Sequence, residues 1–98
     1  MAITSNSLHH SDATTMLHPY TDARLHEAQG PMIIERGKGI HLWDSEGKQY
    51  IDGLAGLWSV GVGYGEPRLQ AAAMAQMEKL PYYHTFAQKS HEPAIRLA

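Results

Sequence analysis

The stretch Asp52-Gly53-Leu54-Ala55-Gly56-Leu57-Trp58-Ser59 decides how this chain is organised, because it places a large aromatic residue in a run punctuated by glycine. It follows a segment with a strand-like pattern and leads into Val60-Gly61-Val62-Gly63-Tyr64-Gly65. Glycine lets a backbone turn freely and approach other groups closely, so we expect regular structure to end here. The pattern is typical either of a loop that serves a ligand or partner, or of a hydrophobic loop packed under a lid.

Upstream of this stretch, the sequence predicts a helix followed by three short strands. Residues 21–29 have the composition of two helical turns, and Gly30-Pro31 would end them. From Met32 the pattern changes to short segments rich in β-branched and aromatic residues. Their spacing predicts an antiparallel three-stranded meander over residues 32–36, 40–44 and 49–52, with Gly47 in the left-handed position of a hairpin loop.

Downstream, the sequence predicts one long helix that begins at Pro67, a residue whose ring suits a first helical turn. It would end before Pro81, and its apolar stripe is expected to pack against the chain's own core, a partner groove being the alternative. Residues 81–86 read as irregular or extended. A last helix starts at Pro93 without a C-terminal cap before Ala98, so we interpret the chain as a truncated piece. The apolar stripe of the long helix that begins at Pro67 comprises Leu69, Ala73, Met77 and Leu80. 

The composition is that of ordinary soluble protein, with 98 residues, 43% of them hydrophobic and 18% charged, and a net charge of −2. The eight Lys and Arg residues form no basic cluster, which argues against a nucleic-acid partner. Cysteine is absent, so disulfides and thiolate metal sites are excluded. Residues 1–17 are polar and resemble neither a signal peptide nor a membrane span, so we expect a flexible leader there and one segment over residues 18–98.

No complete catalytic constellation emerges from the residues themselves. Seven histidines invite a metal site, but no two of them share a helical face with a nearby carboxylate, so we predict none. The alternate glycines Gly61, Gly63 and Gly65 lack the Lys-Ser or Lys-Thr that completes a phosphate-binding loop. Ser59 lacks the glycine-flanked elbow of a serine nucleophile.

The order of several motifs, however, resembles the N-terminal part of class III aminotransferases, over residues 17–98. These are pyridoxal-phosphate enzymes of fold type I, and the likeness is greatest to ω-transaminases that use pyruvate as amino acceptor. The fold class expected on this basis is an α+β fragment of a larger α/β parent. The motifs are His18-Pro19-Tyr20-Thr21, Gly39-Ile40-His41-Leu42-Trp43-Asp44-Ser45-Glu46-Gly47-Lys48, Asp52-Gly53-Leu54-Ala55-Gly56-Leu57-Trp58, Gly63-Tyr64-Gly65 and Leu80-Pro81-Tyr82-Tyr83-His84-Thr85-Phe86.

The resemblance implies substrate-binding roles that spacing alone does not. In that family, residues matching Leu57 and Trp58 line the substrate pocket, Trp58 being an apolar wall that selects the donor's side chain. Ser59, the next residue, is also expected to bind substrate. Tyr20 also borders the pocket, as does Phe86, which the neighbouring subunit of a homodimer would lend. The pocket rim departs from many ω-transaminases at Tyr20, Ser59, Tyr82, His84 and Ala87, so donor preference does not carry over.

The resemblance also implies what these residues lack. The family's catalytic lysine, the acid facing the pyridine nitrogen and the phosphate-binding loop would lie beyond Ala98, and neither Lys79 nor Lys89 takes the lysine's place. We therefore expect no catalytic or cofactor-binding residue here, and an isolated chain that is inactive and binds no pyridoxal 5'-phosphate. The parent would be a cytoplasmic homodimer acting on amine and keto-acid substrates. The alternatives are an aminomutase of the same fold and a non-catalytic interaction module built on Tyr82, Tyr83 and Phe86.

Overall fold

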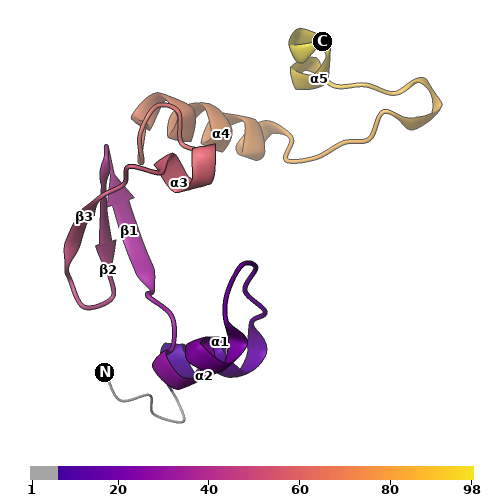
Figure 1. The fold of residues 1–98 in the computed structure, drawn as a ribbon. Helices are drawn as coiled ribbons and strands as arrows, with labels where there is room; N and C mark the ends of the chain where they lie inside the picture. Colours follow the sequence, from indigo (N-terminus) through magenta and orange to yellow (C-terminus); the bar gives the residue numbers. More distant parts are fainter. Residues whose placement is uncertain (1–6) are drawn as a thin grey trace. The chain divides into compact units, whose positions relative to one another are not determined.

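The structure is a computed structural model that describes residues 7–98, and its contacts divide the chain into two compact units after Tyr64. The first unit holds two helices, a small sheet and a tight turn, and the second holds two helices and a short 3₁₀ turn (Figure 1). In chain order the elements are α1 (Leu8–Thr15), α2 (Ala23–Gln29), β1 (Ile34–Lys38), β2 (His41–Asp44), β3 (Gln49–Ile51), α3 (Ala55–Trp58), α4 (Pro67–Lys79), η1 (Phe86–Gln88) and α5 (Glu92–Leu97).

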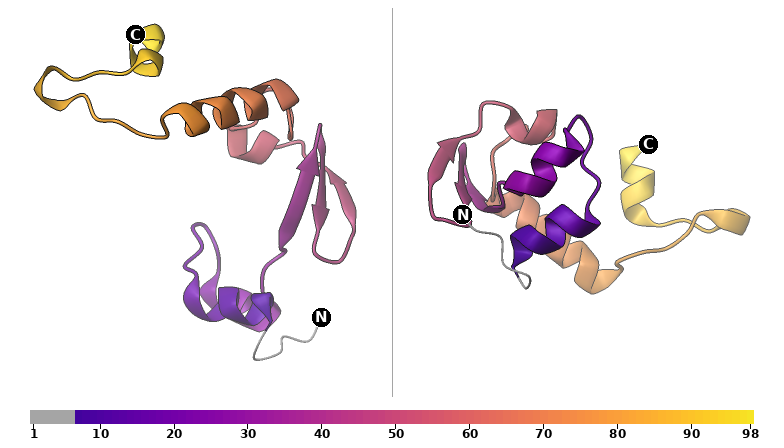
Figure 2. Two further views of the ribbon diagram at one scale, coloured as in Figure 1. Left: turned by 180° about the vertical axis from the view of Figure 1, so that it is seen from behind. Right: turned by 60° about the horizontal axis from the view of Figure 1, so that its bottom comes forward.

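Helices α1 and α2 lie side by side in the first unit (Figures 1 and 2). The carboxylate of Asp22 caps α2 by accepting hydrogen bonds from two backbone N–H groups, and Gly30 ends the helix with φ of 73°. The predicted helix over residues 21–29 is therefore confirmed, with its start two residues later. Helix α1 falls within the segment expected to be a leader, and its residues carry no apolar stripe that could have predicted it.

The three strands form an antiparallel sheet in the order β1-β2-β3, which confirms the predicted meander. Strand β1 starts at Ile34 rather than Met32 and continues to Lys38, with an irregularity in its pairing after Ile34. Arg36 stands opposite Trp43, and its guanidinium carbon lies 3.8 Å from the centre of the indole ring. This cross-strand cation–π contact adds to the pairing of the first two strands.

The loop between β2 and β3 is built around Asp44, the one buried polar side chain among the described residues. Its carboxylate accepts hydrogen bonds from the backbone N–H groups of Glu46 and Lys48 at 3.0 and 2.9 Å and from the Tyr50 hydroxyl at 2.8 Å. The Tyr50 bond is the main reason that the pKa of Asp44 lies below its usual range. Gly47 has φ of 84°, as predicted for the hairpin loop.

The second unit begins at Gly65, and α4 occupies the predicted span. The Glu66 carboxylate accepts a hydrogen bond from the Arg68 N–H, Pro67 stands in the first turn, and the helix ends before Leu80. The chain from residue 80 to residue 91 is mostly irregular, and α5 then begins at Glu92. These observations confirm the predicted long helix, irregular stretch and last helix.

Apolar burial is the point on which the structure departs from expectation. Across residues 7–98 no apolar side chain is buried, and the α4 stripe is largely exposed, at 60% for Leu69 and 63% for Met77. The prediction that this stripe packs against the chain's own core is wrong, because the chain offers too few elements to cover it. Among the helices of the described part, none has the length and apolarity needed to cross a membrane.

Candidate functional site

The glycine-punctuated stretch forms a left-handed turn, α3. Gly56 has φ/ψ of 58°/38° and Leu57 of 60°/57°, and φ is also positive at Ala55 and Trp58, at 49° and 66°. The Trp58 N–H donates to the Leu54 carbonyl at 3.0 Å, and the Ser59 N–H to the Ala55 carbonyl at 2.9 Å. The turn therefore has helical hydrogen bonds but a mostly left-handed backbone.

A left-handed backbone is unfavourable for residues other than glycine, by about 1–2 kcal/mol each. Ala55, Leu57 and Trp58 all adopt it within one turn. Such conformations persist only where surrounding interactions enforce them, and they are concentrated at active sites and ligand clamps. The turn is for this reason the strongest candidate for a functional site in the first unit.

The carboxylate of Asp52 holds the start of this turn. Its Oδ1 accepts a hydrogen bond from the Leu54 N–H at 3.2 Å, and its Oδ2 accepts from the Gly56 N–H at 2.8 Å and from the Tyr64 hydroxyl at 2.5 Å. The Tyr64 bond is the main cause that lowers the pKa of Asp52, and it outweighs desolvation, which acts in the opposite direction. The same bond raises the pKa of Tyr64.

Tyr64 in turn connects the site to the sheet. Its backbone exchanges two hydrogen bonds with Gly39, at 2.9 and 2.8 Å. Its ring lies so close to Gly37 that a Cβ there would be 2.7 Å from the Tyr64 Cγ. A Cβ on Gly56 would likewise be 2.8 Å from the Val60 Cγ2 and 3.0 Å from the Tyr64 hydroxyl. The glycines thus allow a close approach that a larger residue would prevent.

A cavity of about 420 Å³ lies between the sheet and the loop. Asp52, Ala55 and Tyr64 contribute to its lining, together with Gly39, Ile40 and residues 60–63. Leu57 and Trp58 are not among the residues that line it.

The predicted site residues of the first unit are exposed. Trp58 is 85% exposed and Leu57 61% exposed, at the end of the left-handed turn. The Ser59 hydroxyl follows directly and donates to the Leu57 carbonyl at 3.4 Å. Tyr20 lies in the link between α1 and α2, is fully exposed, and has φ of 51°. The structure therefore brings Leu57, Trp58 and Ser59 together in one turn and places Tyr20 in a separate loop.

Phe86 belongs to the second unit, at the start of η1, and is 81% exposed. Ala87 and Gln88 follow it with φ of 54° and 64°. In the described residues, positive φ outside glycine occurs only at Tyr20, within α3 and directly after Phe86. Backbone strain thus coincides with, or adjoins, the positions expected to border a substrate pocket.

Sequence reasoning missed the residues that organise the turn. Asp52 was part of the quoted motif but had no role assigned, although Asp commonly bonds the backbone two residues on. Tyr64 had no signal beyond its place between two glycines. Its partnership with Asp52 spans twelve positions, and only the fold brings the two side chains together.

Comparison with known proteins places the chain in a family. The class III aminotransferase family model matches residues 23–98, so the chain belongs to the class III aminotransferases. It is 45% identical over 82 residues to a putrescine–pyruvate aminotransferase of Pseudomonas aeruginosa, covering 84% of this chain and 18% of that protein. It is 43% identical to mitochondrial γ-aminobutyrate transaminase 1 of Oryza sativa subsp. indica, covering 85% of this chain and 16% of that protein.

Solved structures agree with this assignment. An ω-transaminase from Pseudomonas jessenii, solved in complex with PMP, superposes with a TM-score of 0.89 at 53% identity, over 94% of this chain and 20% of that one. A thermostable ω-transaminase variant, engineered for asymmetric synthesis of enantiopure bulky amines, superposes with a TM-score of 0.90 at 52% identity over the same shares. Its substitutions include its tryptophan 58 and phenylalanine 86. The chain spans about a fifth of the length of these relatives.

The described residues do not fit a pyridoxal-phosphate site. Lys79 pairs with Glu92 at 3.2 Å and its side chain is 69% exposed, and Lys48 lies over the Tyr50 ring. All four lysines of the chain, at positions 38, 48, 79 and 89, are exposed, and none stands in an enclosed pocket of the kind that the cofactor requires.

Proposed function

We propose that this chain is the substrate-selecting N-terminal segment of an aminotransferase that moves an amino group from an amine or ω-amino acid to a keto acid, pyruvate in the first instance. The proposal rests on the left-handed turn that presents Leu57 and Trp58 in a class III aminotransferase chain. Pyruvate is favoured because a putrescine–pyruvate aminotransferase is among the relatives. Pyridoxal phosphate would be held by residues of the parent outside this chain and would supply the electron sink for amino transfer.

In this proposal the residues of the chain bind and orient the donor. The Trp58 indole forms a rigid apolar wall, Leu57 extends it, and Ser59 adds a polar edge. Asp52 and Tyr64 set the position of that wall through the turn, since they hold the backbone at Leu54 and Gly56. A wall held in this way admits donors by shape, which changes relative rates among donors rather than the chemical step.

The engineered relative supports the assignment of Trp58 and Phe86. Its tryptophan 58 and phenylalanine 86 carry the same numbers and residue types as Trp58 and Phe86 here, and that variant was made for bulky amines. Enlarging a pocket by removing an aromatic side chain is the expected route to accepting bulkier donors. Phe86 would reach the pocket from the partner subunit of a homodimer, and Tyr20 would border the same pocket. A cytoplasmic location stays a prediction.

The test compares donors in the full-length protein. Replacing Trp58 by Gly should raise kcat/KM for a bulky aromatic amine relative to that for a small amine by about tenfold or more, because the wall is removed. Trp58→Phe keeps an aromatic wall and should change this ratio much less. Equal losses for all donors in Trp58→Gly would contradict the role in selection.

The same assays separate the alternatives. An aminotransferase needs a keto-acid acceptor, so activity should vanish when pyruvate is omitted. An aminomutase would turn over without an acceptor, and an interaction module would show no turnover in the full-length protein. The aminotransferase names of the relatives favour the first outcome.

A further inference from the structure

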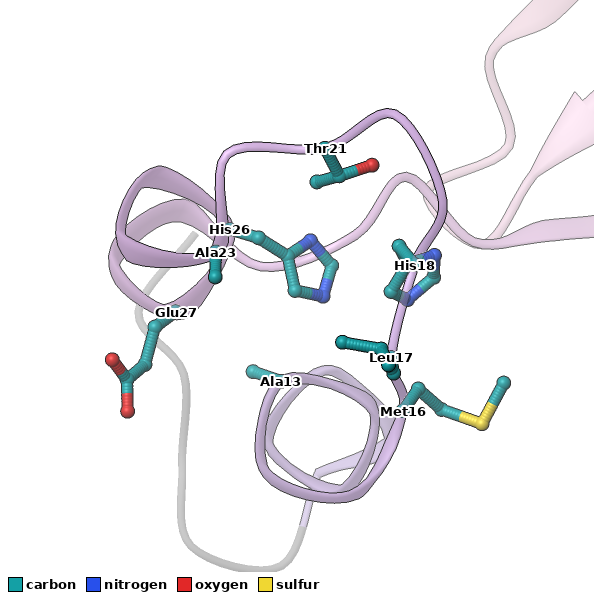
Figure 3. Close-up of a pocket in the computed structure, with 8 residues that line it drawn as sticks. All are labelled: Ala13, Met16, Leu17, His18, Thr21, Ala23, His26 and Glu27. Carbon is teal, nitrogen blue, oxygen red and sulfur yellow. The ribbon is translucent and has the colours of Figure 1, made fainter.

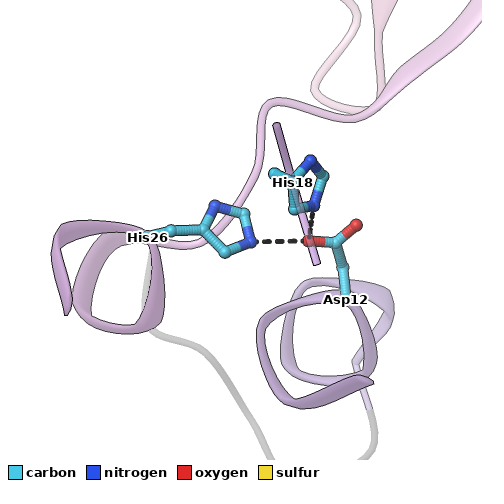
Figure 4. A group of neighbouring side chains, drawn as sticks. All are labelled: Asp12, His18 and His26. Carbon is cyan, nitrogen blue, oxygen red and sulfur yellow. Dashed lines mark hydrogen bonds and ion pairs between the residues drawn. The ribbon is translucent and has the colours of Figure 1, made fainter. Parts of the chain in front are cut away.

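Three side chains away from the left-handed turn α3 converge in the first unit: Asp12 from α1, His18 from the link and His26 from α2 (Figure 4). The Nε2 atoms of His18 and His26 each lie 2.8 Å from the same oxygen, Oδ1 of Asp12. The three ligand atoms all lie within 4.8 Å of one another. The sequence predicts no metal site because no two histidines share a helical face with a carboxylate. This cluster instead spans two helices and a loop.

We propose that Asp12, His18 and His26 form a binding site for a divalent transition metal ion, with Zn²⁺ as the occupant. Two imidazole nitrogens and one carboxylate oxygen are a ligand set that Zn²⁺ accepts, and a water molecule completes a four-coordinate site. The site is independent of amino transfer. It would fasten α1 to α2, the two helices that supply Asp12 and His26.

The geometry needs only a small opening to admit the ion. Metal–ligand distances of about 2.0–2.2 Å in a tetrahedron separate the ligand atoms by about 3.3 Å. The present separations between Asp12 Oδ1 and the two ring nitrogens are 2.8 Å, so each must lengthen by about half an ångström. The two rings already converge, with centres 4.3 Å apart.

Metal binding at this cluster requires the two histidine rings to release or move the protons on their Nε2 atoms. Each ring now donates its Nε2–H to Asp12, or carries protons on both nitrogens. On binding, Nε2 gives its electron pair to the metal, so a neutral ring moves its proton to Nδ1 through water and a charged ring releases one proton to solvent. The Asp12 carboxylate needs no proton change.

The surroundings give the ion access and partial shelter. The side chains of His18, Asp12 and His26 are 31%, 22% and 12% exposed, which leaves a route from solvent to each ligand. A cavity of about 210 Å³ lies beside the rings (Figure 3). Ala13 and Leu17 line part of its wall, and Thr21 stands on the same cavity, which has room for the water ligand.

The experiment is a titration of the full-length protein with Co²⁺ and with Zn²⁺. We expect calorimetry to show that one Co²⁺ binds per chain. The bound Co²⁺ should give the visible absorption band of a four-coordinate site, and added Zn²⁺ should displace the Co²⁺ and remove this band. His26→Gln and His18→Gln should each weaken binding by at least about tenfold, because even residues that only support a ligand contribute about 10–100-fold. His41→Gln and His91→Gln remove histidines outside the cluster and should bind as the unaltered chain does.

Asp12 is tested by a pair of variants. Asp12→Asn removes the charged ligand and should lose the Co²⁺ band, whereas Asp12→Glu keeps a carboxylate and should retain it. Far-ultraviolet circular dichroism of both variants shows whether the helices persist, so loss of binding with retained helix supports the site. Absence of the Co²⁺ band in the unaltered chain, or undiminished binding in His26→Gln, would overturn the proposal and leave a hydrogen-bonded cluster.

Discussion

At the scale of single residues, Asp52 is the group on which the left-handed turn α3 depends most, because its carboxylate accepts from the N–H groups of Leu54 and Gly56. Its pKa is lowered chiefly by the Tyr64 hydroxyl, so folding favours the charged carboxylate. The resulting stabilisation is present above the ordinary pKa of an aspartate and is lost as pH falls through the lower, folded value. In the full-length protein with its other tryptophans replaced by Phe, Trp58 fluorescence should report this loss as an acid transition whose midpoint lies below the ordinary aspartate pKa.

Tyr64→Phe provides the matched control for that transition. It removes the hydroxyl but keeps the ring against Gly37, so the midpoint should move up toward the ordinary aspartate value. Asp52→Asn should abolish the transition, because the amide does not titrate in this range. An identical midpoint in the unaltered chain and in Tyr64→Phe would show that the Asp52–Tyr64 bond does not control the turn.

At the scale of elements, the left-handed turn requires glycine at position 56. Alanine there would adopt φ of 58° and place its Cβ 2.8 Å from the Val60 Cγ2. Gly56→Ala in the full-length protein should therefore lower the free energy of unfolding by about 1–3 kcal/mol, measured by denaturant titration. Gly53 has open space for a Cβ and no positive φ, so Gly53→Ala should stay within about 0.5 kcal/mol of the parent. Equal effects of the two substitutions would contradict the requirement for glycine at position 56.

The elements also show where sequence reasoning succeeds and where it stops. Gly30, Gly47 and Pro67 carry local signals, since each serves a backbone position that few other residues suit, and the elements next to them were predicted. The handedness of residues 55–58 carries no such signal, because Leu57 and Trp58 do not favour a left-handed backbone by themselves. The Asp52 carboxylate holds the neighbouring N–H of Gly56, and its bond to Tyr64 depends on the fold. The Asp12 cluster was missed for the same reason, as its members meet through the packing of α1 on α2.

At the scale of the whole molecule, the missing apolar core matters most. Large apolar side chains such as Leu69, Met77 and Phe86 are exposed in the described residues, and stable small domains bury such groups. Each fully buried side chain of this size would contribute about 1.5–3 kcal/mol. The covering surface is expected from the remaining four fifths of the aminotransferase fold, since the chain spans 18–20% of its relatives.

The isolated 98-residue chain should therefore melt without a cooperative transition and bind a hydrophobic dye such as ANS, while the full-length protein melts sharply. It should also fail to bind pyridoxal phosphate, because every lysine in the chain is exposed and none stands in a site that suits the cofactor. Absorbance of the purified chain mixed with pyridoxal phosphate, before and after borohydride, tests this point, and Lys79→Arg is its control. A reducible band that Lys79→Arg abolishes would place a cofactor-binding lysine in this chain. A sharp calorimetric peak for the isolated chain would show that these residues are stable without the surface that class III aminotransferases add to them.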